Sequence, residues 1–121
     1  MILVDTSVWV EHLRAGDAAL SRHLDDGEVL IHPFVIGELA LGNLLQRNIV
    51  LGALSDLPRA QVATDAEALH FIDAHNLHGR GIGYVDVHLL AASRLTAGAK
   101  LWTHDRRLHG VAQALGVAFA S

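Results

Sequence analysis

Four acidic residues stand in or directly after apolar stretches that offer them no local cation. Asp5 follows the run ILV, Glu38 lies within PFVIGELALGNLL (33–45), Asp86 lies within IGYVDVHLLAAS, and Asp105 follows LWTH. A helix as apolar as 33–45 is expected in the interior, where an ionised carboxylate is costly unless it is paired or bound to a metal. Clustered carboxylates also repel one another, which raises their pKa values. Mg²⁺ or Mn²⁺ removes both costs, because these cations take oxygen ligands.

The apolar runs, caps and glycines predict strands that alternate with helices along the whole chain. Strands are predicted over 2–5, 28–32, 59–63, 100–104 and 117–119, and helices over 8–14, 18–27, 33–45, part of 47–56, 64–77, 84–98 and 105–116. This alternation predicts a three-layer α/β/α sandwich around a central, mostly parallel five-stranded sheet. The sequence contains no internal repeat or linker, so we expect residues 1–121 to form a single domain.

This topology predicts that the four acids meet at one edge of the sheet. In parallel α/β sheets, ligands bind outside the carboxyl ends of the strands, near the switch in strand order. Asp5 ends the first strand and Asp105 follows the fourth. Glu38 lies about two turns into a helix that leaves the second strand, and Asp86 lies in the first turn of a helix that must start near the same edge. We therefore expect a shared carboxylate pocket.

Each acid also has an ordinary explanation. Asp5 and Asp105 could cap the helices that follow them. Asp86, in the first turn of its helix, could interact favourably with the positive end of the helix dipole. Glu38 could pair with an Arg across the core. The joint placement of all four at one edge is what favours the metal site.

Composition limits the classes of partner and compartment. The net charge is −4, from 9 Lys and Arg against 13 Asp and Glu, and eight of the nine cations are Arg. This balance indicates a few directional contacts with phosphate or carboxylate groups instead of a diffuse basic surface. The absence of Cys excludes disulfides and thiolate ligands and predicts a cytoplasmic protein. No apolar run is long enough to span a membrane, and the first residues do not resemble a secretory signal.

Four segments resemble a known family. MILVDTSVWVEHLR, FVIGELALG, GYVDVHLLAAS and LWTHDRRL are similar, in order and spacing, to the four acidic blocks of PIN-domain ribonucleases, and most of all to the VapC toxins of bacterial toxin–antitoxin pairs. The resemblance implies that the acids hold Mg²⁺ or Mn²⁺ and activate water to cut RNA. It implies supporting roles near the metal for two hydroxyls, those of Ser7 and Thr103. It also implies a VapB-like antitoxin partner and a homodimer.

Two further parts of the site are ligands for a second metal and cations that could bind RNA. No further acid closely follows Asp105, so a second metal would have few ligands. An RNA strand also needs cations around a pocket whose own carboxylates repel phosphate. Four arginines are candidates for this rim, although each also fits a plain surface charge: Arg14, Arg80, Arg106 and Arg107.

Three competing functions can be weighed against a ribonuclease. A phosphatase of the haloacid-dehalogenase type needs a second acid at the position of Ser7. A zinc enzyme could draw on the nine histidines, but the spacings His75–His78 and His104–His109 match no zinc pattern. A non-catalytic protein of the same fold could use the acidic pocket to capture a basic peptide, such as an antitoxin tail, and the fold alone does not exclude it.

Overall fold

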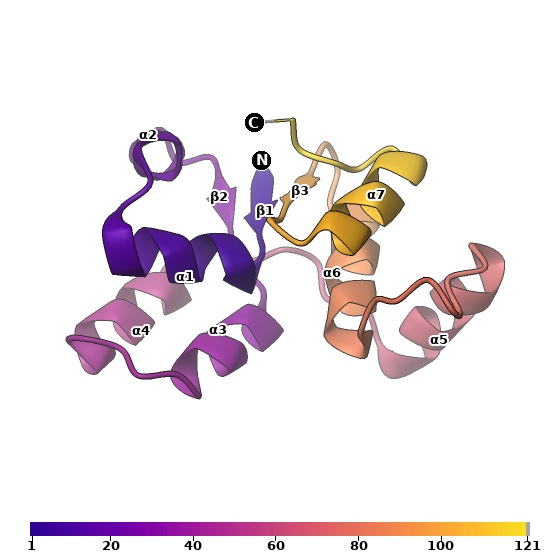
Figure 1. Ribbon diagram of the computed structural model, residues 1–121, viewed down its shortest axis with the longest axis horizontal. Coiled ribbons are helices and arrows are strands. Elements are labelled where there is room, and N and C mark those ends of the chain that lie inside the picture. Colours follow the sequence, from indigo (N-terminus) through magenta and orange to yellow (C-terminus); the bar gives the residue numbers. More distant parts are fainter. Residues whose placement is uncertain (121) are drawn as a thin grey trace.

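The computed structural model describes residues 1–120, which form a short parallel sheet surrounded by helices (Figure 1). In chain order the elements are β1 (Ile2–Val4), α1 (Thr6–Ala15), α2 (Ala18–Asp25), β2 (Val29–Leu30), α3 (Pro33–Ala40), α4 (Arg47–Ser55), α5 (Asp65–Ala74), α6 (Tyr84–Leu95), β3 (Lys100–Trp102) and α7 (Arg106–Ala114). Figure 1 shows α1 to α4 on one side of the strands and α5 to α7 on the other. The predicted α/β class with a parallel sheet is confirmed.

The strand order places β1 in the centre of the sheet. The order is β2-β1-β3, and both pairs are parallel, with Leu3 opposite Leu30 on one side and opposite Leu101 on the other. The chain first moves from β1 to β2 and later crosses to β3 on the opposite side. The strand order therefore switches at β1, and in open parallel sheets the crevice at such a switch point is where ligands bind.

The prediction of five strands is not confirmed, because the described residues form three. The predicted strands 59–63 and 117–119 are each reduced to a single parallel bridge, Ile31 with Arg59 and Leu101 with Ala118. Pro33 begins α3 two residues after Ile31, so little extended backbone is left there for a longer ladder. A run of apolar residues indicates a strand, but the number of paired residues depends on how much extended partner backbone is available.

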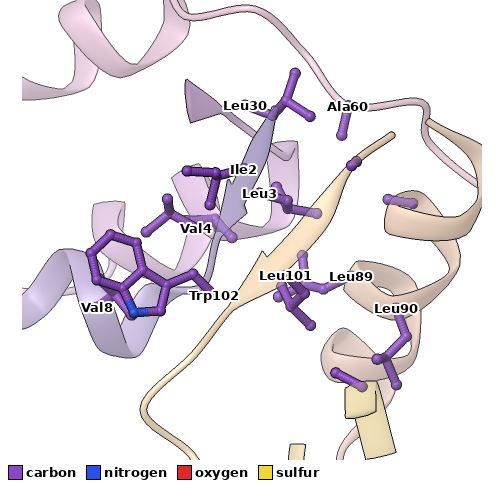
Figure 2. Close-up of a cluster of buried hydrophobic side chains, with 14 of the residues drawn as sticks. Ile2, Leu3, Val4, Val8, Leu30, Ala60, Leu89, Leu90, Leu101 and Trp102 are labelled. Carbon is purple, nitrogen blue, oxygen red and sulfur yellow. The ribbon is translucent and has the colours of Figure 1, made fainter. Parts of the chain in front are cut away.

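The core joins the central strand to the helices on both sides. Leu3 and Val4 of β1 are fully buried, as are Leu89 and Leu90 of α6. Figure 2 shows these side chains grouped with those of the neighbouring strands. Burial of such side chains contributes about 1.5–3 kcal/mol each, and it fixes β1, β3 and α6 relative to one another. The segments that carry Asp5, Asp86 and Asp105 are therefore attached to the best-packed part of the molecule.

The helix predicted over 33–45 is shorter and less buried than expected. Residues 33–40 form α3, and the helix ends before Gly42 and Asn43. Leu41 and Leu45 lie beyond it and are 90% and 91% exposed. The apolar residues of 33–45 therefore do not form one buried face, and the prediction of an interior helix throughout this segment is wrong.

None of the helices within residues 1–120 combines the length and apolar character that a membrane crossing requires.

Candidate active site

Asp5 is buried at the end of β1 and is held by two hydroxyl groups. Ser7 Oγ and Thr103 Oγ1 each donate a 2.7 Å hydrogen bond to Oδ2 of Asp5, whose residue is only 7% exposed. The backbone N–H groups of His104 and Asp105 donate to these hydroxyls, each at 3.0 Å. Asp5 occupies the cap position of α1, yet its side chain makes no capping hydrogen bond. The capping explanation for Asp5 is therefore wrong, and the network orients the carboxylate instead.

Asp86 lies in the first turn of α6, and the charges of the other three acids affect its pKa. Its Oδ2 accepts a 2.9 Å hydrogen bond from the N–H of Gly83. Burial raises the pKa of Asp86, the Gly83 hydrogen bond opposes this change, and the negative charges of Asp5, Asp105 and Glu38 raise the pKa further. The four acids predicted to share an edge are thus close enough for their charges to interact.

Glu38 reaches this group from the solvent side of α3. The residue is exposed, whereas Val35 and Leu39 on the other face of the helix are buried. Its Oε1 accepts a 2.6 Å hydrogen bond from the hydroxyl of Thr6, the first residue of α1. The expectations that Glu38 is buried and that it could pair with an Arg across the core are wrong. Thr6, which holds Glu38 by this hydrogen bond, was not among the residues predicted for the site.

Asp105 has both a capping role and a free oxygen. Its Oδ1 accepts a 2.9 Å hydrogen bond from the N–H of Leu108, so it caps α7 as its ordinary explanation predicted. Within residues 1–120, Oδ2 of Asp105 accepts no hydrogen bond. Capping by one oxygen fixes the carboxylate and leaves the other available to a ligand.

The four candidate rim arginines lie in different surroundings. Arg14 is near the far end of α1, where its guanidinium bonds both oxygens of Glu11 at 2.8 Å, and this placement does not favour a role at the acidic edge. Arg107 lies over Gly81, since a Cβ built there would be 2.9 Å from Cδ and Nη1 of the arginine. The exposed side chains of Arg80, Arg106 and Arg107 form no ion pair with any residue that the structure describes.

The donor set fits a hydrated divalent cation. No Lys or Arg forms an ion pair with any of the four acids in the described part of the chain, so their negative charge is uncompensated there. No group of three or more His, Asp or Glu residues in that part is arranged so that the group could hold a metal ion. Mg²⁺ keeps several waters and commonly uses only one or two protein carboxylates, so an open group of oxygen donors suits it.

Comparison with known proteins assigns the chain to a family. The family model for the PIN domain matches residues 2–114. The chain belongs to the PIN-domain family. Two relatives, each named Ribonuclease VapC32, come from the CDC 1551 / Oshkosh and ATCC 25618 / H37Rv strains of Mycobacterium tuberculosis. Each is 51% identical over 120 residues, which cover 99% of this chain and 97% of the relative. The predicted kinship with VapC-type PIN-domain proteins is confirmed.

A solved structure supports the PIN fold independently. The crystal structure of FitAcB from Neisseria gonorrhoeae matches with a TM-score of 0.65 at 23% identity. The match covers 98% of this chain and 95% of that chain. At this level of identity the likeness concerns the fold, and it extends over nearly the whole PIN-domain chain.

Proposed function

We propose that this PIN-domain protein is a ribonuclease, the toxin of a toxin–antitoxin pair, which hydrolyses RNA phosphodiester bonds with Mg²⁺ or Mn²⁺. The observation that carries the proposal is the group of four uncompensated acids. Burial raises the pKa of Asp86 most, and the charges of Asp5, Asp105 and Glu38 raise it further. The 51% identity to proteins named as ribonucleases supports the reaction class. A non-catalytic capture protein is not favoured by that kinship.

The four acids are proposed to act as ligands, directly or through water. A divalent ion, when bound, lowers the pKa of its water and offsets the charge that builds on the phosphate during attack. Asp5 is oriented by the hydroxyls of Ser7 and Thr103, and Asp86 by the N–H of Gly83. Such fixed orientation limits the reorganisation that binding requires. The carboxylates repel phosphate, so substrate contacts come from donors around them.

Glu38 and Asp105 are proposed to complete the site from its more exposed side. The hydroxyl of Thr6 positions Glu38, and the cap to Leu108 positions Asp105. Three exposed cations near the site are proposed as phosphate-binding groups: Arg80, Arg106 and Arg107. Arg14 is not part of this proposal because it is engaged with Glu11.

A VapB-like antitoxin is the proposed protein partner. The helices α1, α3 and α4 pack together and, with the segment that joins α3 to α4, present exposed apolar side chains. We define this group as the apolar strip: Val10, Leu13, Leu41, Leu45 and Ile49. Exposed apolar side chains of this kind typically anchor a protein partner. A basic side chain of the partner would then enter the acidic pocket and form charge-assisted hydrogen bonds. A homodimer, a single domain over 1–121 and a cytoplasmic location complete the proposal.

The test is cleavage of RNA by purified protein in the presence and absence of a divalent cation. Total RNA is incubated with the protein in Mg²⁺, in Mn²⁺ and in EDTA, and the new ends are sequenced. We expect defined cuts with either cation, no cuts in EDTA, and no cuts by Asp5→Asn. Intact RNA under every condition, together with binding of a basic peptide that requires Asp5, would support the capture protein instead.

A further inference from the structure

A shallow, open groove lined by polar residues and one glycine runs along α7 beside the acidic edge. Its volume is about 370 Å³, near the lower end of the range of small-ligand sites, and Thr103 and Asp105 contribute to its lining. The rest of the lining comes from His104, Arg106, His109, Gly110 and Gln113, and the last four recur at helical spacing on one face of α7. We call this the α7 groove. It adjoins the acidic edge because it shares two residues with it.

The side chains that line the α7 groove have unused hydrogen-bonding groups. Those of His104, Arg106, His109 and Gln113 make no hydrogen bond and no ion pair with other residues in the described range 1–120. They offer a guanidinium, two imidazoles and an amide. The described lining also includes the carboxylate of Asp105, whose Oδ1 accepts a hydrogen bond from Leu108. This set of donors suits an anionic ligand that also carries hydrogen-bonding edges.

Gly110 contributes to the lining of the α7 groove, at a cost in helix stability. It lies within α7, where glycine is less favourable than alanine by about 1 kcal/mol. A Cβ at this position would meet nothing within 4 Å, so packing gives no reason for glycine here. An alanine at position 110 would place a methyl group in the open space at the groove.

We propose that the α7 groove holds the nucleotide next to the cleaved phosphodiester, which orients the RNA strand across the acidic edge. This inference rests on the proposed ribonuclease function. Arg106 and His104 contact the phosphate, and His109 and Gln113 contact the base, by stacking and by hydrogen bonds to its edge. Unpaired bases are commonly recognised in this way by ring side chains and amides. His104, His109 and Gln113 are therefore positioning residues for the substrate.

A peptide partner fits this groove less well than a nucleotide. Protein partners obtain most of their binding energy from buried apolar anchors. Among residues 1–120, no apolar side chain lines the α7 groove, whereas Leu41, Leu45 and Ile49 of the apolar strip are exposed on other segments. The chemistry of the two surfaces therefore favours RNA in the α7 groove and a protein partner on the apolar strip.

The first experiment compares His109→Ala/Gln113→Ala with the wild type on single-stranded RNA of random sequence. We expect KM to rise about five- to tenfold, as the loss of one or two hydrogen bonds implies, while kcat changes little. Sequencing of the ends should also show a weaker base preference beside the cut. An unchanged KM together with an unchanged base preference would overturn the proposal.

A second experiment uses a variant that should fold better than the wild type. Gly110→Ala adds a methyl group to the groove and should raise Tm through helix propensity while KM for RNA also rises. Gly52→Ala in α4 is the matched control, because a Cβ there also meets nothing within 4 Å. This control should raise Tm without changing KM. If Gly110→Ala and Gly52→Ala have the same KM, the groove does not hold substrate.

Binding measured without cleavage separates this proposal from the proposed function. Fluorescence anisotropy of labelled random-sequence RNA is recorded with Asp86→Asn alone and with Asp86→Asn/His109→Ala/Gln113→Ala. We expect about five- to tenfold weaker binding by the triple variant, even if the wild type cuts no RNA. Equal RNA affinity of these two variants would overturn the groove proposal. If the triple variant binds RNA as tightly as Asp86→Asn but no longer binds a protein partner, the groove belongs to that partner.

Discussion

The hydroxyl of Thr103 donates a 2.7 Å hydrogen bond to Oδ2 of Asp5 across 98 residues of sequence. Thr103 directly follows β3 and Asp5 directly follows β1, so this bond joins the carboxyl ends of two neighbouring parallel strands. The oxygen of Thr103 also accepts the N–H of Asp105. One buried hydroxyl therefore fixes both the most buried acid of the site and the backbone of the last one.

Thr103→Val should destabilise the fold and disturb the acidic edge. Valine keeps the shape but leaves buried Oδ2 of Asp5 with one donor fewer and the N–H of Asp105 without an acceptor. We expect the free energy of unfolding to fall by about 1–3 kcal/mol, measured by urea denaturation in EDTA. Thr103→Ser keeps the hydroxyl and should recover more than half of the loss. Equal losses in both variants would contradict the role of this hydrogen bond.

Glu38→Gln should separate function from stability. Because Glu38 is exposed, the substitution should change the free energy of unfolding by less than about 0.5 kcal/mol. If Glu38 is a metal ligand, RNA cleavage should fall at least about tenfold. Cleavage of total RNA and thermal melting are measured on the same preparation. Asp73→Asn, an exposed acid of α5, is the control and should retain full cleavage.

Metal should stabilise the wild type but not Asp5→Asn/Asp86→Asn. A cation that binds only the folded state adds about 2.7 kcal/mol at a hundredfold excess over its Kd. We therefore expect Mg²⁺ or Mn²⁺ to raise the Tm of the wild type and not that of the double variant. Equal shifts in the two proteins would place the ions elsewhere.

A separate, metal-free experiment on Asp86→Asn alone follows from the raised pKa of Asp86. The folded protein binds the Asp86 proton more tightly than the unfolded chain does, so this group favours folding below its ordinary pKa of 3.8. That contribution is lost as pH rises through the folded pKa. In EDTA near neutral pH, Asp86→Asn should therefore melt higher than the wild type, and the difference should shrink on acidification.

His32 should make the protein sensitive to mild acid. It is fully buried, and burial, then the neighbouring His88, then Arg59 lower its pKa from 6.5 to about 4. The unfolded chain takes up this proton at higher pH than the folded protein, so stability is lost as pH falls from about 6.5 to about 4, by about 3 kcal/mol in all.

His32→Asn tests this assignment while keeping a hydrogen-bond acceptor. Nδ1 of His32 accepts the N–H of Phe34 at the start of α3, and an Asn oxygen suits the same position. The variant should lose some stability at pH 7 through looser packing, but its stability should depend less on pH between 6.5 and 4. Urea denaturation at several pH values measures both effects. Parallel curves for the variant and wild type would assign the acid sensitivity to other groups.

Leu41→Ser/Leu45→Ser should weaken the antitoxin complex without affecting the fold. The two side chains are 90% and 91% exposed, so their removal should alter the free energy of unfolding by less than about 0.5 kcal/mol. The partner is recovered by pull-down from the native host, and its affinity is titrated with Mn²⁺. We expect lower affinity for the variant and, with wild type, affinity that falls as Mn²⁺ rises. Affinity independent of Mn²⁺ would mean that the partner blocks RNA outside the pocket.

The sequence predicted features that depend on local patterns or on sheet topology. The helix predicted over 64–77 is present as α5, which begins at a capping box formed by Thr64 and Glu67. Asp5 and Asp105 follow neighbouring parallel strands as predicted, because the carboxyl ends of such strands share an edge. Both kinds of prediction rest on spacing along the chain, which the sequence contains directly.

The sequence did not predict which side of a segment turns toward the core or which other segment it pairs with. Glu38 lies in an apolar segment, but α3 turns only part of that segment toward the core. The short strand pairing at Arg59 is limited by the start of α3 at Pro33. His104 and His109 were considered only as zinc ligands, whereas the α7 groove becomes visible once the helix is placed beside Asp105.

The central position of β1 has a consequence for synthesis on the ribosome. β1 emerges first, yet one of its two neighbours, β3, and the hydroxyl that holds Asp5 are made almost 100 residues later. A nascent chain that ends before β3 has an open strand edge and only part of the acid group, because Asp105 is still missing. It therefore has no assembled nuclease site, and fragments from interrupted translation should be inert toward RNA and readily degraded. Any activity begins only when translation is nearly complete.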